Sequence, residues 1–208
     1  MADIPHPLFA RFFDRLSHVM ERELAPRRDE LLAGLSGRVV EVGAGNGINF
    51  SHYPGTVDEV IAIEPEPYLR ARADVAARSA PVRVSVRAGV ADALELEDAS
   101  VDAAVTSLVL CSVSDQARAL SELRRVVRPG GELRFLEHVR SSAPGKARVQ
   151  GAADGSAIWP RLAGGCHCSR DTVSALGAAG FRISSVRELD FGPSWMITNP
   201  HVIGSAVR

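Results

Sequence analysis

The 208-residue sequence contains only three cysteines and no long hydrophobic segment. Three cysteines cannot all pair, and their spacing is not that of a disulfide scaffold, so we expect a reducing, cytoplasmic environment. The longest apolar run, residues 103–113, is interrupted by Thr106, Ser107 and Ser112 and is shorter than the ~20 residues that span a membrane. Residues 1–7 lack the basic and apolar pattern of a secretory signal. We therefore expect neither a transmembrane segment nor secretion.

The sequence also lacks an excess of charge of either sign. Its 24 basic and 25 acidic residues give a formal net charge of -1, and basic residues cluster only in short pairs such as Arg27-Arg28 and Arg124-Arg125. A protein that neutralises nucleic-acid phosphates needs clustered Lys and Arg, so we expect no nucleic-acid partner. No internal repeat and no low-complexity linker divides the chain, which favours a single domain.

Apolar, β-branched segments alternate with segments of helical periodicity through the middle of the chain. Strands are predicted at residues 38–42, 60–63, 82–86, 101–107 and 132–137, and helices at 67–78 and 114–127. Such alternation is typical of βαβ units and predicts an α/β fold with a parallel sheet and helices on both faces. Pro129-Gly130-Gly131 predicts a turn before the last of these strands. A ligand crevice is expected at the carboxyl ends of the strands.

The two ends of the chain depart from this alternation. Helical periodicity from Leu8 to Leu35 is interrupted by Pro26, which predicts two helices that could cap a pocket. Towards the other end, helices are predicted at 146–162 and 171–179, a strand at 181–189 and a closing strand at 201–207. We therefore divide the domain, residues 1–208, into a helical cap (1–35), a cofactor-binding core (36–140) and an acceptor-side segment with the closing strands (141–208).

The glycines Gly43, Gly45 and Gly47 follow the first predicted strand directly. A backbone without Cβ atoms can turn tightly and approach a ligand closely. The spacing is G-x-G-x-G, and Ile48 stands where a dinucleotide-binding loop has its third glycine. Glu41, just before the glycines, would disfavour a pyrophosphate but could bind an ammonium group. Glu64, at the end of the second strand, could accept both ribose hydroxyls.

Four segments resemble successive motifs of class I S-adenosylmethionine-dependent methyltransferases: residues 39–47 (VVEVGAGNG), 63–65 (IEP), 89–92 (GVAD) and 123–131 (LRRVVRPGG). The resemblance implies a Rossmann-like single domain with a mostly parallel seven-stranded sheet and an antiparallel last strand. It also implies S-adenosylmethionine as cofactor and a cofactor site made of Glu41, Gly43, Ala44, Gly45, Asn49, Glu64, Pro65, Gly89, Ala91, Asp92 and Leu108. Among these, Glu41, Gly43, Gly45 and Asn49 would surround the methionine part, Glu64 the ribose, Ala91 and Asp92 the adenine, and Leu108 the underside of the cofactor.

A narrower resemblance is carried by residues 107–113 (SLVLCSV), 137–139 (EHV), 165–166 (GC), 170–172 (RDT) and 200–204 (PHVIG). These segments are similar to the methyltransferase-like thiol S-methyltransferases of animal endoplasmic-reticulum and lipid-droplet membranes and their bacterial relatives. The resemblance implies methyl transfer to small thiols. The hydrophobic amino-terminal anchor of the animal proteins is missing from residues 1–35, so membrane residence is not expected.

Methyl transfer from a sulfonium requires a well-placed nucleophile and exclusion of water, and a thiol acceptor with a pKa near ~8.5 gains from a nearby base. His138, after the fifth strand, is the first candidate base, with the ordering of a neighbouring loop as its alternative role; His167 is the second candidate. Cys166 and Cys168 flank His167, but no second ligand pair accompanies them, so we expect no metal. Cys111 is interpreted as a core residue.

Other acceptors and other functions stay open at this point. The acceptor pocket could use the late aromatic residues Trp159, Phe191 and Trp195, and Phe9, Phe12 and Phe13 could close over it, although aromatic residues are more often core. A small aromatic or quinone-like molecule methylated on O, N or C is therefore an alternative small-molecule acceptor. An NAD(P)-dependent oxidoreductase and a non-catalytic cofactor-binding module are more distant alternatives. The only tyrosines, Tyr53 and Tyr68, form no Tyr-x-x-x-Lys pair. The sequence leaves the oligomeric state open.

Overall fold

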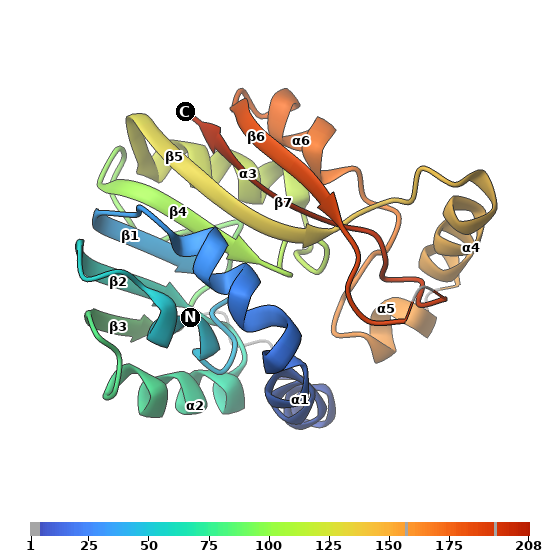
Figure 1. Ribbon diagram of the computed structural model, residues 1–208, viewed down its shortest axis with the longest axis horizontal. Coiled ribbons are helices and arrows are strands. Elements are labelled where there is room, and N and C mark those ends of the chain that lie inside the picture. The colour runs from blue at the N-terminus through green and yellow to red at the C-terminus, as the bar shows by residue number, and fades with distance from the viewer. Residues whose placement is uncertain (1–4, 157, 194) are drawn as a thin grey trace.

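A seven-stranded sheet forms the centre of the protein (Figure 1). We describe residues 5–156, 158–193 and 195–208 of this fold from a computed structural model. The strands, in the spatial order β3-β2-β1-β4-β5-β7-β6, are β1 (Gly37–Val42), β2 (Val57–Ile63), β3 (Arg83–Arg87), β4 (Val101–Ser107), β5 (Val127–His138), β6 (Arg182–Leu189) and β7 (His201–Val207). Only β7 runs antiparallel to its neighbours, β5 and β6. The predicted fold, including the antiparallel last strand, is confirmed.

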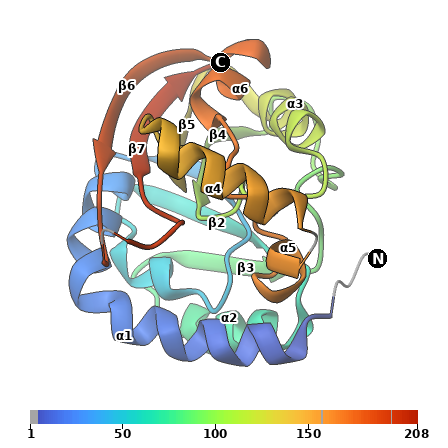
Figure 2. The ribbon, with the colours of Figure 1, turned by 90° about the vertical axis from the view of Figure 1, so that its right-hand side faces the viewer.

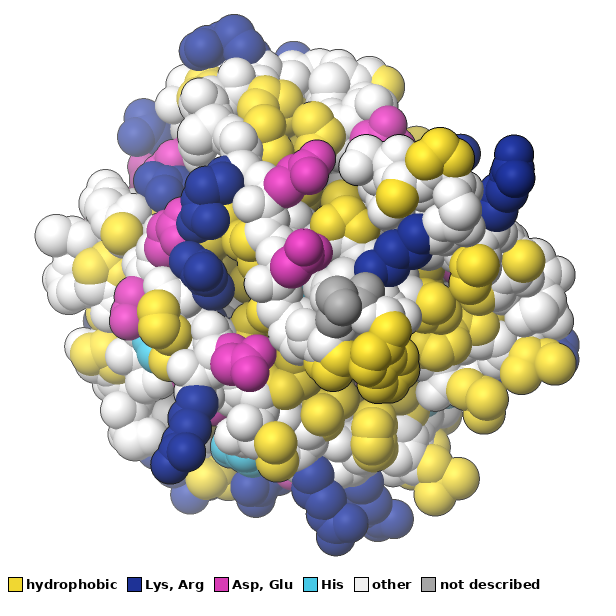
Figure 3. Space-filling model, turned by 45° about the vertical axis from the view of Figure 1, so that its right-hand side comes forward, with side chains coloured by type: hydrophobic (Ala, Val, Ile, Leu, Met, Phe, Trp, Pro, Cys, Tyr) yellow, Lys and Arg dark blue, Asp and Glu magenta, His cyan; other side chains and the backbone are white. Residues whose placement is uncertain are grey.

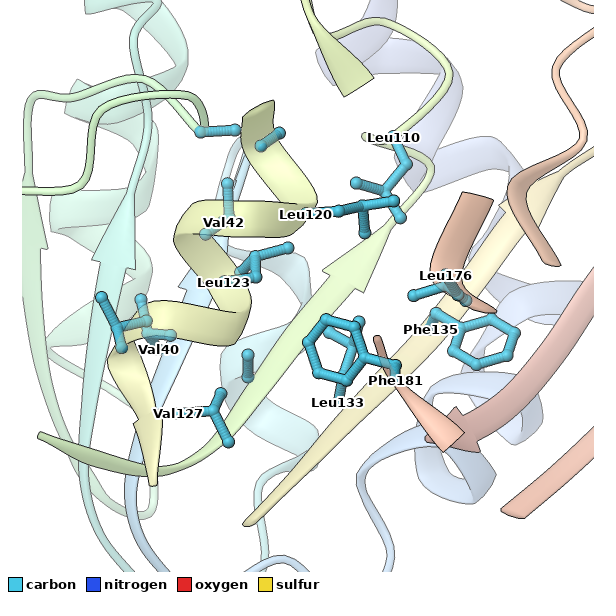
Figure 4. Close-up of a cluster of buried hydrophobic side chains, with 14 of the residues drawn as sticks. Val40, Val42, Leu110, Leu120, Leu123, Val127, Leu133, Phe135, Leu176 and Phe181 are labelled. Carbon is cyan, nitrogen blue, oxygen red and sulfur yellow. The ribbon is translucent and has the colours of Figure 1, made fainter. Parts of the chain in front are cut away.

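Helices cover both faces of this sheet, as expected. They are α1 (Pro7–Leu32), the short 3-10 helix η1 (Ile48–His52), α2 (Pro67–Ala77), α3 (Gln116–Val126), α4 (Pro144–Gly155), α5 (Ile158–Leu162) and α6 (Thr172–Ala178). On one face, Val40 and Val42 pack with Leu120 and Leu123 of α3, and Figure 4 shows Leu176 and Phe181 in the same cluster. On the other face, Leu31, Leu32 and Ala73 of α1 and α2 pack on Val39 and Val60. Alternate residues of β1 thus face opposite layers, as the period of two along a strand requires.

The amino-terminal segment is one long helix and not two, which corrects the prediction from Pro26. Proline removes one backbone hydrogen bond but does not end a helix whose packing continues beyond it. The buried face does continue, because Leu24 before the proline and Arg28, Leu31 and Leu32 after it are all buried. Figure 2 shows that the helix bends between its two halves, as an internal proline explains.

Two further boundaries differ from the prediction. The expected helix at 146–162 is divided into α4 and α5, with residue 157 outside the described residues; the Ser156 hydroxyl accepts hydrogen bonds from the backbone N–H groups of Ile158 and Trp159 and so begins the second helix. The expected turn at 129–131 is an irregularity inside β5, where the register against β4 jumps from Val127 to Glu132.

The strand order changes direction between β1 and β4, which places a crevice at the carboxyl ends of these two strands. Val42, Ser107 and His138 are the last residues of β1, β4 and β5, and the segments that follow them meet at this end of the sheet. Among the described residues, no helix has the length and hydrophobicity needed to cross a membrane.

Candidate active site

The loop after β1 is a tight turn that only glycine permits at two positions. Gly43 has φ of 67°, and a Cβ atom built on it would lie 2.5 Å from Cγ2 of Val109. Gly47 has φ of 79°, and its Cβ would lie 2.6 Å from the Phe50 ring. The N–H groups of Gly43 and Ala44 both donate to the carbonyl oxygen of Ile63, which holds the loop against the end of β2. The hydrogen bonds to Ile63 and the close packing at Gly43 and Gly47 therefore fix the conformation of the loop.

Glu64 lies directly beside this loop. Its carboxylate accepts hydrogen bonds from the N–H of Gly45, at 2.8 Å, and from the N–H of Glu66, at 2.9 Å. Each carboxylate oxygen receives one of these bonds and retains a second lone pair. Burial raises the pKa of Glu64 above its ordinary value, against the two backbone hydrogen bonds. The residue is thus held in a fixed orientation in which both oxygens can accept hydroxyl groups.

Glu41 is buried at the end of β1 within a chain of hydrogen bonds. Its carboxylate accepts from the amide of Asn49, at 2.6 Å, and from the hydroxyl of Tyr53, at 2.8 Å. The Arg28 guanidinium of α1 donates in turn to the Asn49 side-chain oxygen, at 2.5 Å. Burial raises the pKa of Glu41 to about 7, although both hydrogen bonds and Arg28 act in the opposite direction. This carboxyl group therefore changes charge near neutral pH, and a cation beside it would favour the ionised form.

This pKa predicts that cofactor binding depends on pH. Below about pH 7 the Glu41 carboxyl is neutral in the free protein. The sequence predicts that Glu41 receives the ammonium group of the cofactor; such binding would require loss of the Glu41 proton to solvent, and affinity should then fall up to about tenfold for each pH unit below 7. Calorimetric titration with S-adenosylhomocysteine between about pH 5.5 and pH 8 measures the slope. Glu41→Gln should bind more weakly at pH 7 and lose the slope, whereas the exposed control Glu97→Gln should keep both. An unchanged slope in Glu41→Gln would show that another group titrates.

Helix α1 covers the glycine loop through polar contacts that the sequence reasoning missed. The Asn46 amide donates to Oδ1 of Asp14, at 2.8 Å, and to the Ser17 hydroxyl, at 2.9 Å. The Tyr68 hydroxyl donates to the other Asp14 oxygen, at 3.1 Å. The Phe13 ring lies 3.4 Å from the Cβ position of Gly45. Asp14 and Ser17 lie on the buried face of α1, where apolar residues are expected. Polar residues at these positions of the helical pattern were the one indication of the contact in the sequence.

The segment after β3 forms the far side of the same crevice. A Cβ on Gly89 would lie 2.9 Å from Cγ2 of Ile63, so the backbone passes close to the end of β2. Ala91 is buried, and Asp92 is half-buried and accepts a hydrogen bond from the Ser114 hydroxyl at 2.8 Å. A hollow of about 240 Å³ is lined by the neighbouring residues Ile63, Arg87, Ala88, Gly89, Val90, Ala93, Leu94 and Glu95. Pro65 joins Glu64 to Glu66, whose side chain begins α2 by accepting from the Leu69 N–H.

Leu108, directly after β4, has φ of 60°, which is uncommon for a side chain of this size. The turn that follows is held by the Glu137 carboxylate, which accepts from the N–H of Val109, at 3.0 Å, and from that of Leu110, at 3.1 Å. From the other side the Arg170 guanidinium donates to the carbonyl oxygens of Leu110, at 2.5 Å, and of Val113, at 2.8 Å. Backbone strain fixed by charged partners is a common property of functional sites.

This turn brings together the side chains of Cys111, His138 and Cys166, which we call the thiol-imidazole group. Nε2 of His138 lies 3.0 Å from Sγ of Cys166, and one ligand atom from each of the three residues lies within 4.8 Å of the others. All three side chains are buried. Val109 of the same turn lies against Gly43, so the group lies on the β4–β5 side of the glycine loop.

The structure thus brings together some of the predicted catalytic residues and not others. His138 belongs to the thiol-imidazole group. His167 does not belong to it; it lies half-buried, and its backbone N–H donates to the Cys111 carbonyl oxygen at 2.8 Å. Cys111 is buried, as expected, but its thiol also faces Cys166 and His138, which was missed. Cys111, His138 and Cys166 are far apart in the sequence, so no short motif indicates that they are in contact.

The aromatic residues named from the sequence have different positions. Trp159 packs against the three cysteines, and Phe191 stacks on His201 with ring centroids 3.7 Å apart. Phe9 stacks with Phe13 and contacts the backbone at Gly164. Large apolar side chains stay exposed on α1, on α5 and near the end of the chain, namely Leu8, Phe12, Ile158, Leu162 and Trp195. Figure 3 shows hydrophobic surface gathered on this side of the molecule.

Comparisons with known proteins agree with this geometry. The profile of the Methyltransferase domain family matches residues 40–135. Human thiol S-methyltransferase TMT1A is 32% identical over 96% of the chain and 86% of the relative, and human TMT1B is 31% identical over 97% and 88%. A Thermotoga maritima S-adenosylmethionine-dependent methyltransferase, described as a possible histamine N-methyltransferase, superposes with a TM-score of 0.69 at 22% identity, covering 96% of this chain and 97% of that chain. A geranyl diphosphate methyltransferase in complex with S-adenosylmethionine superposes with a TM-score of 0.69 at 15% identity, covering 96% and 90%. The chain therefore belongs to the family of S-adenosylmethionine-dependent methyltransferases that contains human TMT1A and TMT1B.

Proposed function

We propose that this enzyme methylates the sulfur of a small thiol. The observation that carries the proposal is the buried thiol-imidazole group, whose turn approaches the glycine loop through Val109 and which contains an imidazole next to a thiol. The names of the human relatives, both thiol S-methyltransferases at about a third identity, support the same acceptor class. The apolar surroundings of the group, Trp159, Ala163 and Ile197, suit a small alkyl or aryl thiol.

The cofactor is expected to lie across the carboxyl ends of β1, β2 and β4. Glu41 and Asn49 would bind the methionine part, with Gly43, Ala44 and Gly45 forming the floor beneath it. Glu64 would accept the two ribose hydroxyls, with Pro65 fixing the chain behind it. Gly89, Ala91 and Asp92 would contact the adenine, and Leu108 would lie below the cofactor. In this arrangement α1 acts as the cap, and residues 141–208 supply the acceptor side.

Methyl transfer is then an in-line displacement. The acceptor sulfur loses its proton to solvent and attacks the methyl carbon; the bond from that carbon to the sulfonium sulfur breaks, and its electron pair stays on the cofactor sulfur as S-adenosylhomocysteine forms. The contribution required of the protein is to hold the sulfur in line, to exclude water and to favour the thiolate over the thiol. We assign the last of these to His138.

A panel of acceptors tests the proposal. Purified enzyme with methyl-labelled S-adenosylmethionine should form S-adenosylhomocysteine and a labelled thioether from small alkyl or aryl thiols. The matched acceptors are the corresponding alcohols and phenols, a quinol and a carboxylate, which should give no labelled product. Turnover of these oxygen or carbon acceptors without turnover of any thiol would contradict the thiol assignment.

Substitution of the two candidate histidines should separate their roles. Loss of a group that assists ionisation of the acceptor lowers turnover about 10²-fold or more, so His138→Ala should lower kcat at least about 100-fold while the affinity for S-adenosylmethionine stays within about twofold. Steady-state kinetics and calorimetry measure the two quantities. His167→Ala tests the second candidate, and a loss in that variant as large as in His138→Ala would move the role to His167.

A further inference from the structure

We propose that Cys111, His138 and Cys166 bind a divalent metal ion, for which Zn²⁺ is the best match, and that its open coordination position takes the sulfur of the acceptor. The inference rests on the proposed thiol acceptor and deepens it. It makes His138 a ligand through which the ion, and not the imidazole alone, favours the thiolate. The sequence predicted no metal because Cys166, His167 and Cys168, which are adjacent in the chain, lack a second ligand pair. The present inference, from residues distant in the chain, replaces that prediction.

The ligand set has the composition of a catalytic zinc site. Two thiolates and one imidazole leave one position of a tetrahedral ion open for substrate, whereas structural sites use four protein ligands. Thiolate and imidazole also bind Zn²⁺ in preference to the hard cations Mg²⁺ and Ca²⁺, which take oxygen ligands. Within the described residues, this is the group of His, Cys, Asp and Glu side chains whose ligand atoms come close enough to hold an ion.

The spacing of the ligand atoms fits an ion between them. Bond lengths of about 2.3 Å to sulfur and about 2.0 Å to nitrogen place tetrahedral ligands roughly 3.5 to 3.8 Å apart. The three atoms lie within 4.8 Å of one another, and Nε2 of His138 lies 3.0 Å from Sγ of Cys166. An ion would replace the proton that these two atoms share, at the cost of a shift of about half an ångström.

The three ligands come from segments that are fixed independently of one another. Glu137 and Arg170 hold the turn that carries Cys111. Asp154 of α4 accepts from the N–H groups of Cys168 and Ser169, each at 2.8 Å, and so fixes the loop that carries Cys166. The His138 ring packs edge-on against His201, with centroids 6.1 Å apart. Such support keeps ligands in place before an ion arrives.

The charges balance in a way that suits sulfur alkylation. Two thiolates neutralise a divalent ion, and the acceptor, bound as a thiolate after its proton passes to solvent, adds one negative charge opposite the positive sulfonium. The acceptor sulfur then attacks the methyl carbon, and the electron pair of the broken bond remains on the cofactor sulfur. The methylated product is a neutral thioether, a weaker ligand than a thiolate, so it leaves the open position.

Cobalt(II) is the probe, because its thiolate complexes absorb in the near-ultraviolet and visible range, where Zn²⁺ complexes do not absorb. The full-length enzyme, depleted of metal with a chelator under reducing, anaerobic conditions, should take up one Co²⁺ per chain with a thiolate-to-cobalt charge-transfer band. Cys111→Ala, Cys166→Ala and His138→Ala should each weaken binding at least about 100-fold, because loss of a direct ligand should cost no less than the roughly 10- to 100-fold typical of a lost outer-shell partner. Cys168→Ala is the matched control: Cys168 is buried beside the group but outside it, and this variant should bind Co²⁺ like the parent.

Two further readings separate this inference from the thiol assignment. A small alkyl thiol should shift the cobalt spectrum of the parent enzyme. In a separate measurement, Zn²⁺ should slow alkylation of Cys111 and Cys166 in the parent, as followed by mass spectrometry; this measurement does not depend on a variant that folds. Absence of the charge-transfer band, or its persistence in all three ligand variants, overturns the metal site. Full thiol turnover by metal-free enzyme also overturns it while the proposed function stands. Cobalt bound at these residues without turnover of any thiol overturns the acceptor and leaves the metal site intact.

Discussion

Replacement of Glu64 by alanine should weaken binding of S-adenosylmethionine at least about 100-fold. Each hydrogen bond from a ribose hydroxyl to a charged carboxylate contributes about 1.5 to 3 kcal/mol, and two are lost, so the total is about 3 kcal/mol or more. The same substitution leaves the N–H groups of Gly45 and Glu66 without their acceptor, which loosens the glycine loop. Calorimetric titration with S-adenosylhomocysteine measures the change.

Two variants control for this result. Glu64→Gln keeps the shape and one acceptor oxygen and should fall between the parent and the alanine variant in affinity. Glu97→Ala removes an exposed acid from the surface and should bind like the parent. Thermal unfolding of each variant separates loss of cofactor contacts from loss of fold. Parent-like affinity in a folded Glu64→Ala protein would show that the ribose binds elsewhere.

Substitution of Gly204 by alanine should lower the free energy of unfolding by about 3 kcal/mol, the upper range for overpacking in a core. Gly204 lies in β7, between Val186 of β6 and Phe135 of β5. An added Cβ would meet the backbone oxygen of Ser185 and would lie 2.8 Å from Cζ of the buried Phe135. A backbone atom of a paired strand cannot move aside as a side chain can, so the sheet must distort.

The effect is measurable as a midpoint of thermal unfolding. For a domain of this length, about 3 kcal/mol corresponds to a decrease of roughly 6 to 12 °C. Gly151→Ala is the matched control, because Gly151 lies inside α4 and an added Cβ meets no atom within 4 Å. That variant should gain about 0.5 to 1 kcal/mol from helix propensity. A Gly204→Ala protein as stable as the parent would mean that β6 and β7 separate at little cost.

The parts of this protein that a short stretch of sequence determines could be predicted from it. The loop could be recognised from the glycines Gly43, Gly45 and Gly47, because the backbone has positive φ values there and few residues other than glycine adopt them. The strands before and after it are buried on both sides and therefore appear as apolar runs. The prediction that Pro26 separates two helices was wrong, because tertiary packing on both sides of the proline outweighs its local preference.

Contacts between distant residues could not be predicted in this way. Cys111 and Cys166 meet because a turn after β4 and a loop after α5 are each fixed by charged partners elsewhere in the chain. Asp14 and Arg28 contact Asn46 and Asn49 from a helix that precedes the whole sheet. Their placement on the buried face of α1 carried a signal, but only the fold shows which loop they reach.

The position of β7 has a consequence for the order of folding. This strand is synthesised after β6, yet it lies between β5 and β6 and pairs with both. Until it emerges from the ribosome, the edge of β5 that faces away from β4 has no partner, and His201, which pairs with His138, has not yet been synthesised. The growing chain can thus assemble β1 to β4 first, while the strand that carries His138 remains open to wrong partners during translation.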